Sequence, residues 1–186
     1  MTVSGAEEIL TLAKEIGALS FGEFTLSSGK NSSYYFDGRL LSLSSSGAAL
    51  LGKSIWARMS ELGVSVVAGP TIGADPLIGA ALATAGEQQA VARGLLVRPE
   101  EKAHGTGKKI EGLMHPRDRV LVVDDVCTKG GSLLRSIEAL EASGCSVAGV
   151  MVVLDRVEGG SELITERGYA FHSILVATPL GDVATA

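Results

Sequence analysis

The sequence predicts an α/β fold, a doubly wound parallel sheet with a small N-terminal hood. Helical spacings of apolar residues separate a series of short apolar stretches, as in a parallel sheet with crossover helices. These stretches lack polar alternation, which is typical of strands covered on both faces, and lie near residues 64, 91, 120, 148 and 172. The chain has 186 residues, so we expect one domain over 1–186, with the hood in 1–43 and the core in 44–178.

The hood is expected to combine a helix with an extended pair. Residues 6–19 carry apolar side chains at helical spacing, which predicts an amphipathic helix. Apolar, polar and turn residues alternate over 21–43, which predicts a hairpin-like pair that turns around Ser28 and Gly29.

Residues 47–54 match the pattern G-x-x-x-x-G-K-[ST] of nucleotide-triphosphate-binding loops. That loop binds phosphate only where it follows a buried strand, whereas Ser44–Ser46 has the character of a helix start. Apolar residues continue at helical spacing through Leu62. We therefore predict a helix here and no site for ATP or GTP.

Two buried strands are expected at 64–68 and 90–97, with a helix of small residues over 77–85 between them. The first strand ends in the glycine-bearing loop Gly69–Pro76, whose backbone amides then lie at the carboxyl edge of the sheet. The residues alone leave open whether this loop is a plain connection or a phosphate contact.

Residues 98–119 are the most unusual stretch, with six of the 16 basic residues and two of the three histidines. They lack an apolar period that would let them pack, and a loop this long is uncommon unless it is functional or disordered. We expect a mobile cationic loop in which Arg98, Lys102 and His104 close on a polyanion. The alternative is a solvated loop whose own acids partly cancel its charge.

The centre of the predicted site follows the apolar strand 120–123. Asp124 and Asp125 end this strand at the edge where open parallel sheets bind ligands. The glycine-bearing loop 128–132 then leads into a helix predicted over 133–141, whose free amides and positive dipole end favour a phosphate. We predict that the acids meet sugar hydroxyls and that the loop meets a phosphate monoester.

The last third of the chain adds a second polar strand end. A buried strand over 147–154 is followed by Asp155 and Arg156, and Arg156 either pairs with a neighbouring acid or donates two parallel hydrogen bonds to a substrate carboxylate. We then expect a helix over 161–168, a strand over 171–177 and a loose tail over 181–186.

Composition narrows the class of protein. A net charge of −5 argues against nucleic acid as the main partner. The longest apolar run has eight residues, far fewer than the roughly 20 of a membrane span. No basic flank precedes an apolar run at the N-terminus, so we expect no signal peptide and a cytoplasmic protein. Cys127 and Cys145 lack metal-ligand spacing and are expected to pack in the core, a nucleophilic role being the alternative for Cys127.

Four motifs together resemble the type I phosphoribosyltransferases, and within them the orotate phosphoribosyltransferases. The resemblance runs from about Leu10 to Thr178. Its motifs are the signature for 5-phosphoribosyl 1-diphosphate (PRPP) at Asp124–Ser132, the catalytic-loop spacing of Arg98, Lys102, His104 and Gly105, the hood turn Thr25-Leu-Ser-Ser-Gly-Lys30 followed by aromatics, and the turn Arg156-x-x-Gly-Gly160.

The resemblance implies the type I phosphoribosyltransferase fold and the transfer of the 5-phosphoribosyl group from PRPP to orotate, giving orotidine 5-phosphate and diphosphate in de novo pyrimidine (UMP) biosynthesis. It also implies Mg2+ carried by the diphosphate without direct protein ligands, and a homodimer in which loop 98–119 reaches the neighbouring site. In the family the loop that corresponds to 71–75 touches the diphosphate.

The resemblance assigns residues to three roles. The catalytic residues are Arg98, Lys102, His104, Asp124 and Asp125, with His104 as a candidate proton donor to the leaving group. The PRPP contacts are Arg98, Lys102, His104, Asp124, Asp125, Val126, Cys127, Thr128, Lys129, Gly130, Gly131 and Ser132. The orotate contacts are Lys30, Tyr34, Tyr35, Thr128 and Arg156.

Two departures and two alternatives accompany this interpretation. Some relatives carry a lysine where this chain has Ser27, with Lys30 as the expected substitute. The family usually has lysine in place of Pro99, and losing a charged hydrogen bond of about 1.5 to 3 kcal/mol is expected to slow the reaction roughly 10- to 100-fold unless Lys108 or Lys109 compensates. The alternatives are a phosphoribosyltransferase for another base and a regulator that binds PRPP without turnover.

Overall fold

The computed structural model describes residues 3–25, 29, 31–99 and 109–186. Its centre is a seven-stranded sheet in the order β5-β4-β3-β6-β7-β8-β9, parallel except for the two outermost strands. The parallel strands are β3 (Val66–Pro70), β4 (Arg93–Val97), β6 (Arg119–Cys127), β7 (Ser146–Asp155) and β8 (Phe171–Ala177). The predicted α/β class is confirmed, and each predicted buried strand is present with its ends shifted by a few residues.

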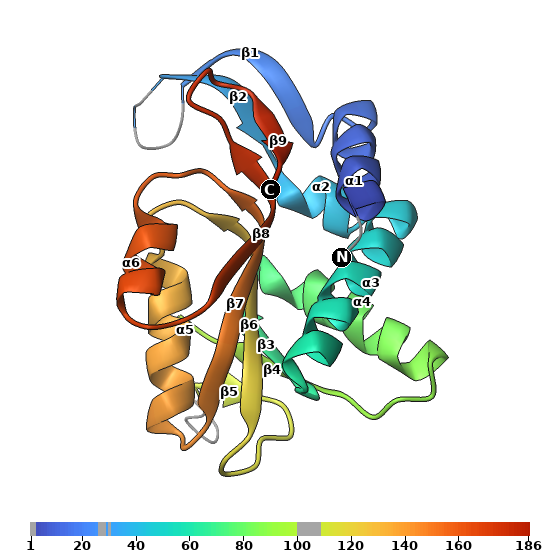
Figure 1. Cartoon of the computed structure of the whole chain (residues 1–186), viewed down its shortest axis with the longest axis vertical. Coiled ribbons are helices and arrows are strands. Elements are labelled where there is room, and N and C mark those ends of the chain that lie inside the picture. The colour runs from blue at the N-terminus through green and yellow to red at the C-terminus, as the bar shows by residue number, and fades with distance from the viewer. Residues whose placement is uncertain (1–2, 26–28, 30, 100–108) are drawn as a thin grey trace.

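Helices cover both faces of the sheet, as Figure 1 shows with the strands nearly edge-on. On one side lie α1 (Val3–Glu15), α3 (Ser45–Leu62) and α4 (Ala74–Glu87), and on the other α5 (Gly131–Ala142) and α6 (Gly160–Glu166). Strand β6 serves both layers: Leu121 and Val123 belong to one buried cluster, and Val120 and Val122 to the other. This two-sided burial is the reason that the strand has no polar alternation.

The hood is a separate antiparallel hairpin of β1 (Leu19–Thr25) and β2 (Asn31–Phe36). The prediction that the extended pair continues to Leu43 is wrong, because a short helix, α2 (Gly38–Ser42), follows β2 directly. Asp37 ends the strand and caps the helix, its side chain accepting a hydrogen bond from the Arg39 amide at 3.0 Å. The chain therefore turns back toward the sheet beside the carboxyl end of β6.

The two edges of the sheet differ from the sequence prediction. Within the predicted loop 98–119, Ile110–Glu111 forms β5 and pairs with Val97 and Leu96 of β4. The predicted loose tail over 181–186 contains β9 (Val183–Thr185), antiparallel to β8. Both strands are very short and cap an otherwise unpaired edge, which explains why no apolar period revealed them.

Gly181, at the turn before β9, also joins the hood to the sheet. Its carbonyl accepts a hydrogen bond of 2.7 Å from the Ser33 hydroxyl of β2. The C-terminal hairpin thereby supports the strand that carries the hood aromatics.

The predicted helix at residues 47–54 is confirmed, because the whole match lies inside α3. Ser44 caps this helix, and its hydroxyl accepts from the Gly47 amide at 3.0 Å. A Cβ on Gly52 would lie 2.6 Å from the Ala80 carbonyl of α4, so this glycine permits close helix packing. Over the described residues, no helix combines the length and apolar character that crossing a membrane requires.

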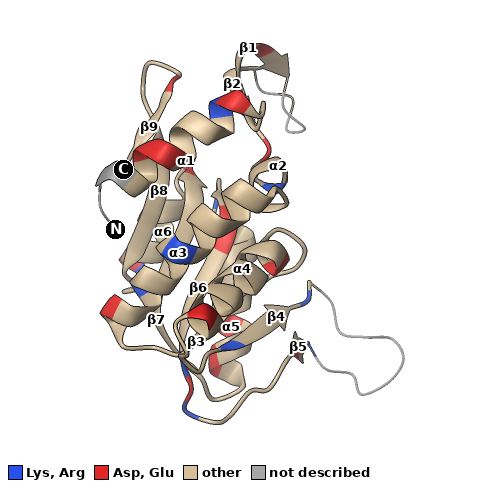
Figure 2. Ribbon diagram, turned by 90° about the vertical axis from the view of Figure 1, so that its right-hand side faces the viewer, with Lys and Arg blue, Asp and Glu red and all other residues tan. Residues whose placement is uncertain are grey.

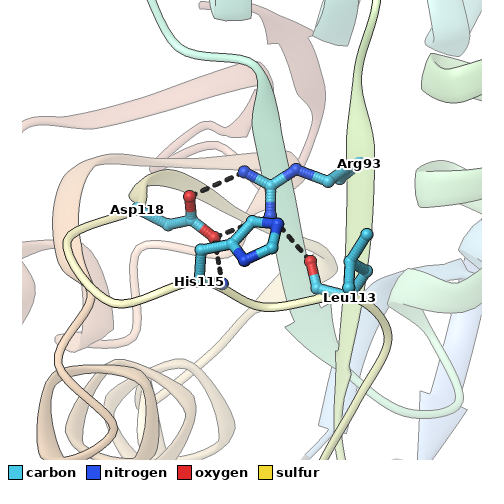
Figure 3. Close-up of polar contacts among 4 residues, drawn as sticks. All are labelled: Arg93, Leu113, His115 and Asp118. Atoms are coloured by element: carbon cyan, nitrogen blue, oxygen red, sulfur yellow. Dashed lines mark hydrogen bonds and ion pairs between the residues drawn. The ribbon is translucent and has the colours of Figure 1, made fainter.

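The C-terminal end of segment 98–119 is held at the amino edge of the sheet, where β4 and β6 begin (Figure 3). Arg93, at the start of β4, donates two hydrogen bonds to the Asp118 carboxylate at 2.6 and 2.9 Å, and a third to the Leu113 carbonyl at 2.7 Å. The His115 amide donates to the same carboxylate at 2.8 Å. The Arg93 guanidinium lowers the pKa of Asp118, because its hydrogen bonds favour the charged carboxylate.

Candidate active site

The site is built on the carboxyl end of β6, where the strand leaves the core and faces α2 (Figure 2). Asp124 is buried and Asp125 is half-buried. One Asp124 oxygen accepts from the Asp125 amide at 2.9 Å, and the other accepts from the Ser132 hydroxyl at 3.1 Å. These bonds fix Asp124 against the first turn of α5 and leave Asp125 beside the cavity described below.

The environment of Asp124 changes its acidity. Burial, and then the negative charge of Asp125, raise the pKa of Asp124 to about 7. The two neighbouring carboxylates repel each other, and a ligand that donates hydroxyl hydrogen bonds would relieve that repulsion.

The loop after the acids turns sharply into α5. Gly130 adopts a left-handed conformation with φ 73°, which favours glycine, and α5 begins at the next residue. The start of α6 supports the loop, since the Gly160 amide donates to the Thr128 carbonyl at 3.0 Å. Thr128, Lys129 and Gly131 are exposed around a helix end whose free amides favour an anion.

Cys127 and Val126 contribute to the loop in a different way. Cys127 is buried, and burial raises the pKa of its thiol to about 12, which fits the expected packing role and opposes a nucleophilic one. Its carbonyl accepts from the Arg156 amide at 2.9 Å, so it ties the ends of β6 and β7 together. Val126 is half-buried and borders the cavity.

A cavity of about 330 Å3 opens between the hood, the β3–α4 loop and the acid pair. Tyr35 of β2, Thr71 and Gly73 line it together with both acids and Ser132. Gly73 has to be small, because a Cβ there would lie 2.7 Å from an Asp125 oxygen and 3.0 Å from an Asp124 oxygen.

The loop 71–75 is held from within. The Thr71 hydroxyl donates to Asp75 at 2.7 Å. The other Asp75 oxygen is buried and has no hydrogen-bond partner among the residues that the structure describes. The loop thus presents Thr71 and Gly73 to the cavity, while Asp75 shapes it from behind.

Asp37, Gly38 and Arg39 also line this cavity, and none of them was predicted. A Cβ on Gly38 would lie 2.8 Å from the Asp125 Cβ, so α2 packs directly on the acid pair. Arg39 donates from Nε and Nη2 to the two Asp37 oxygens, at 3.1 and 3.3 Å. The signal for them was Asp37 followed by a helix-forming run, a helix start that the alternating pattern concealed.

The two tyrosines of β2 point to opposite sides. Tyr35 is 44% exposed and borders the cavity, whereas Tyr34 is only 6% exposed. The Arg156 guanidinium lies over the Tyr34 ring, 5.0 Å from its centre, and its Nε donates to Glu158 at 2.8 Å. Arg156 is not among the residues that line the cavity beside the acid pair, so the structure brings it to Tyr34 and not to the acids.

Arg98 stands at the end of β4, on the other side of the β3–α4 loop. Its amide donates to the Lys109 carbonyl at 2.9 Å, and its guanidinium lies 3.6 Å from a Glu111 oxygen. The exposed Pro99 follows it. Three other expected site residues, Lys30, Lys102 and His104, lie outside the described residues.

Comparison with known proteins shows that this chain is similar to phosphoribosyltransferases. The family model for the phosphoribosyl transferase domain matches residues 66–167. The orotate phosphoribosyltransferase of Rhodopirellula baltica is 38% identical over 173 residues, which cover 90% of each chain. That of Pyrococcus abyssi is 39% identical over 96% of each chain.

Solved structures agree in fold. The crystal structure of Mycobacterium tuberculosis orotate phosphoribosyltransferase in complex with PRPP superposes with a TM-score of 0.75 at 32% identity, covering 92% of this chain and 96% of that one. The similarity therefore spans the core, the hood and the site between them.

Proposed function

We infer that this chain, which belongs to the orotate phosphoribosyltransferase family, transfers the 5-phosphoribosyl group of PRPP to orotate, giving orotidine 5-phosphate and diphosphate in pyrimidine biosynthesis. The observation that carries the proposal is the hydrogen bond of 3.1 Å between Ser132 and Asp124. It holds a carboxylate pair and a phosphate-type loop in one rigid unit at the sheet edge. A sugar phosphate carries hydroxyls that suit the acid pair and a phosphate that suits the loop.

The sugar is held, and water excluded, while the bond between ribose C1 and the diphosphate oxygen breaks. That step builds positive charge on the ring and negative charge on the leaving group. An orotate ring nitrogen bonds to C1 and gives up its proton, which leaves with the diphosphate or passes to water. Asp124 and Asp125 take the ribose hydroxyls, and loop 128–132 takes the 5-phosphate. Neither acid needs to act as a nucleophile.

The diphosphate is met by the loop 71–75 and by the cations of segment 98–119. Thr71 and Gly73 border the cavity beside the acids, and Arg98 stands behind them. Lys102 and His104 are assigned by their spacing from Arg98, with His104 as the candidate proton donor to the leaving oxygen.

Orotate lies between the hood and the β7 end. Tyr35 offers an exposed aromatic face at the cavity, while Arg156, held over Tyr34, offers a planar donor for the orotate carboxylate. Thr128 and Lys30 complete the proposed contacts. Arg156 has to turn from Glu158 toward the ligand, which is a change of side-chain rotamer.

Mg2+ is part of the proposal as a cation carried by the diphosphate. Within the described ranges, no group of three or more histidine, cysteine, aspartate or glutamate side chains is placed to hold a metal. Both Asp124 oxygens already accept hydrogen bonds. The donor set therefore fits a metal held mainly by ligand oxygens, and the metal would supply neutralisation of the leaving group.

The proposal extends to a homodimer in a cytoplasmic enzyme that binds no nucleic acid. The segment 98–119 begins and returns at an edge of the sheet, through the pairing of β4 and β5. From there the loop of one subunit would serve the site of the next, and a net charge of −5 offers no general surface for a nucleic acid. The metabolic role of the family supports the location.

The test is an assay of orotate absorbance on addition of PRPP and Mg2+, with uracil and the purine bases as competing substrates. We expect steady consumption of orotate only. Arg156→Ala is expected to raise the KM for orotate about 10- to 100-fold, because a charged hydrogen-bond pair to the carboxylate is lost, while the KM for PRPP stays within about twofold.

Arg167→Ala is the matched control, because it removes an exposed arginine that pairs with Glu138 on the outer surface. If the protein converts another base instead of orotate, that base is the substrate and the assignment of orotate is wrong. PRPP binding without turnover would instead support a regulator. An unchanged KM for orotate in Arg156→Ala would contradict the carboxylate contact.

A further inference from the structure

A second, smaller cavity adjoins the candidate active site. It has a volume of about 60 Å3 and shares Pro70, Thr71 and Ser132 with the large cavity. Arg98 at the end of β4 and Arg135 of α5 both line it, and none of its described lining residues is acidic. The larger cavity thus contains the acids, and the smaller one, which we call the annex, contains two guanidinium groups.

Arg135 differs from the other arginines near the site. One of its guanidinium nitrogens, Nη1, lies 3.3 Å from the place that a Cβ on Gly131 would occupy, so the side chain turns back toward the start of its own helix. Arg98 has Glu111 at 3.6 Å and Arg39 has Asp37 at 3.1 Å. Arg135 has no ion-pair or hydrogen-bond partner in the part of the chain that the structure describes.

This arrangement suits an anion. A guanidinium is always charged and presents a planar set of donors, so an unbalanced one at the wall of a cavity is a ready phosphate ligand. Three hydroxyls, from Thr71, Ser132 and Ser136, also line the annex, but each already donates its proton within the protein, so the guanidinium groups are the donors that remain for an anion. Of the loop 128–132 proposed for the 5-phosphate, only Ser132 lines the annex.

We propose that Arg135 is a further substrate-binding residue, which forms with Arg98 a two-arginine subsite for the diphosphate of PRPP. The inference rests on the proposed function, since it presumes PRPP as the ligand of the large cavity. Ser132 and Thr71 border both cavities, so a ribose held by the acid pair has the annex within reach of its C1 substituent. Arg135 then supplies charge that Glu111 partly removes from Arg98.

Calorimetric titration of inorganic diphosphate and of ribose 5-phosphate, each with Mg2+, separates the two phosphate sources. Arg135→Gln is expected to weaken diphosphate binding about 10-fold and to leave ribose 5-phosphate binding within about twofold. Arg135→Lys keeps the charge without the planar donors, so its log Kd for diphosphate should lie about halfway between those of the wild type and Arg135→Gln. Arg167→Gln, which changes an exposed arginine paired with Glu138 away from the cavity, should bind both ligands as the wild type does.

Steady-state kinetics give an independent readout: the KM for PRPP rises about 10-fold in Arg135→Gln, and the KM for orotate does not change. Unchanged diphosphate binding in Arg135→Gln overturns the proposal. Equal weakening of ribose 5-phosphate assigns Arg135 to the 5-phosphate and also overturns it. Because Arg135 is exposed, melting temperatures should match the wild type.

The proposed function fails separately. A wild type that binds neither ligand and consumes no orotate would remove the function itself, whereas a wild type that turns over orotate while Arg135→Gln is unaffected would remove only the annex.

Discussion

Asp124 sets the balance between binding and stability at the residue scale. Its carboxyl is buried beneath the hood, beside the charge of Asp125 and against Ser132. A neutral side chain would suit this environment better in the absence of ligand. The protein nevertheless keeps an acid at this position. The carboxylate lowers the stability of the free protein, but it can accept hydrogen bonds from the hydroxyls of a ligand.

Asp124→Asn is therefore expected to stabilise the free protein at high pH. The pKa of Asp124 is about 7 in the folded chain, against an ordinary aspartate value of 3.8, so the folded state keeps a proton that the unfolded state loses between about pH 4 and 7. Stability from this group falls as the pH rises through that range. The rise of this pKa from 3.8 to about 7 corresponds to about 4 kcal/mol at pH 8, so after a cost of about 1 kcal/mol for an altered hydrogen bond we expect a gain of roughly 3 kcal/mol, and no gain at pH 4.

Urea denaturation at both pH values measures this difference. Glu7→Gln, at an exposed position of α1, is the control and should show no such gain. An Asp124→Asn protein that is less stable than the wild type at pH 8 would contradict the electrostatic account of the acid pair. Its orotate turnover should be lost at either pH.

At the scale of elements, segment 98–119 is fixed at both ends. The pairing of β4 with β5 holds it at the carboxyl edge, and the fork of Arg93 on Asp118 holds it at the amino edge (Figure 3). The sequence showed the basic residues and the missing apolar period, but a two-residue strand leaves no periodic signal. Arg93 and Asp118 are 25 residues apart in the chain, and only the parallel register of β4, β3 and β6 places them together.

Arg93→Ala is expected to destabilise the protein by about 2 to 3 kcal/mol, because a half-buried carboxylate loses two charged hydrogen bonds. Arg167→Ala, which removes an exposed pair with Glu138, should cost less than about 1 kcal/mol. The pKa of Asp118 is lowered in the folded state, so the contribution is present above about pH 4 and disappears as the pH falls through the folded pKa.

Thermal unfolding at pH 7 and at pH 3 distinguishes the two variants. Below its melting temperature, Arg93→Ala should keep the kcat and KM of the wild type, because the fork lies at the opposite edge of the sheet from the site. A stability equal to that of Arg167→Ala at pH 7 would show that the fork contributes nothing beyond a surface ion pair.

At the scale of the whole molecule, a loop that serves the adjacent subunit predicts complementation. Lys102→Ala and Asp125→Asn chains should each be nearly inactive alone. When the two variants are mixed at equal concentration and exchange subunits, half of the dimers are hybrids. Each hybrid has one intact site out of two, so about a quarter of the wild-type activity should return.

Mass spectrometry of the intact dimers checks that exchange has occurred, because a hybrid has a mass between those of the two homodimers, and a mixture of Lys102→Ala with wild type provides the reference rate. Hybrids that form but remain inactive would mean that each subunit supplies its own loop.

The sequence by itself determined the buried strands, the helices over the two faces, and the position of Asp124, Asp125 and the loop to Ser132. These features are local: an unalternated apolar run, a carboxyl pair at its end and a glycine turn before a helix all lie within one short stretch, and short-range sterics and hydrogen bonding specify them.

Only the tertiary structure decided which distant groups meet. Arg156 stacks on Tyr34, Gly38 and Gly73 close over the acids, and Arg135 turns toward the annex that it shares with Arg98. Each of these contacts joins separate strands or loops through the order of the sheet. Side-chain direction at a strand end or in the first turns of a helix depends on that packing, and no pattern along the chain encodes it.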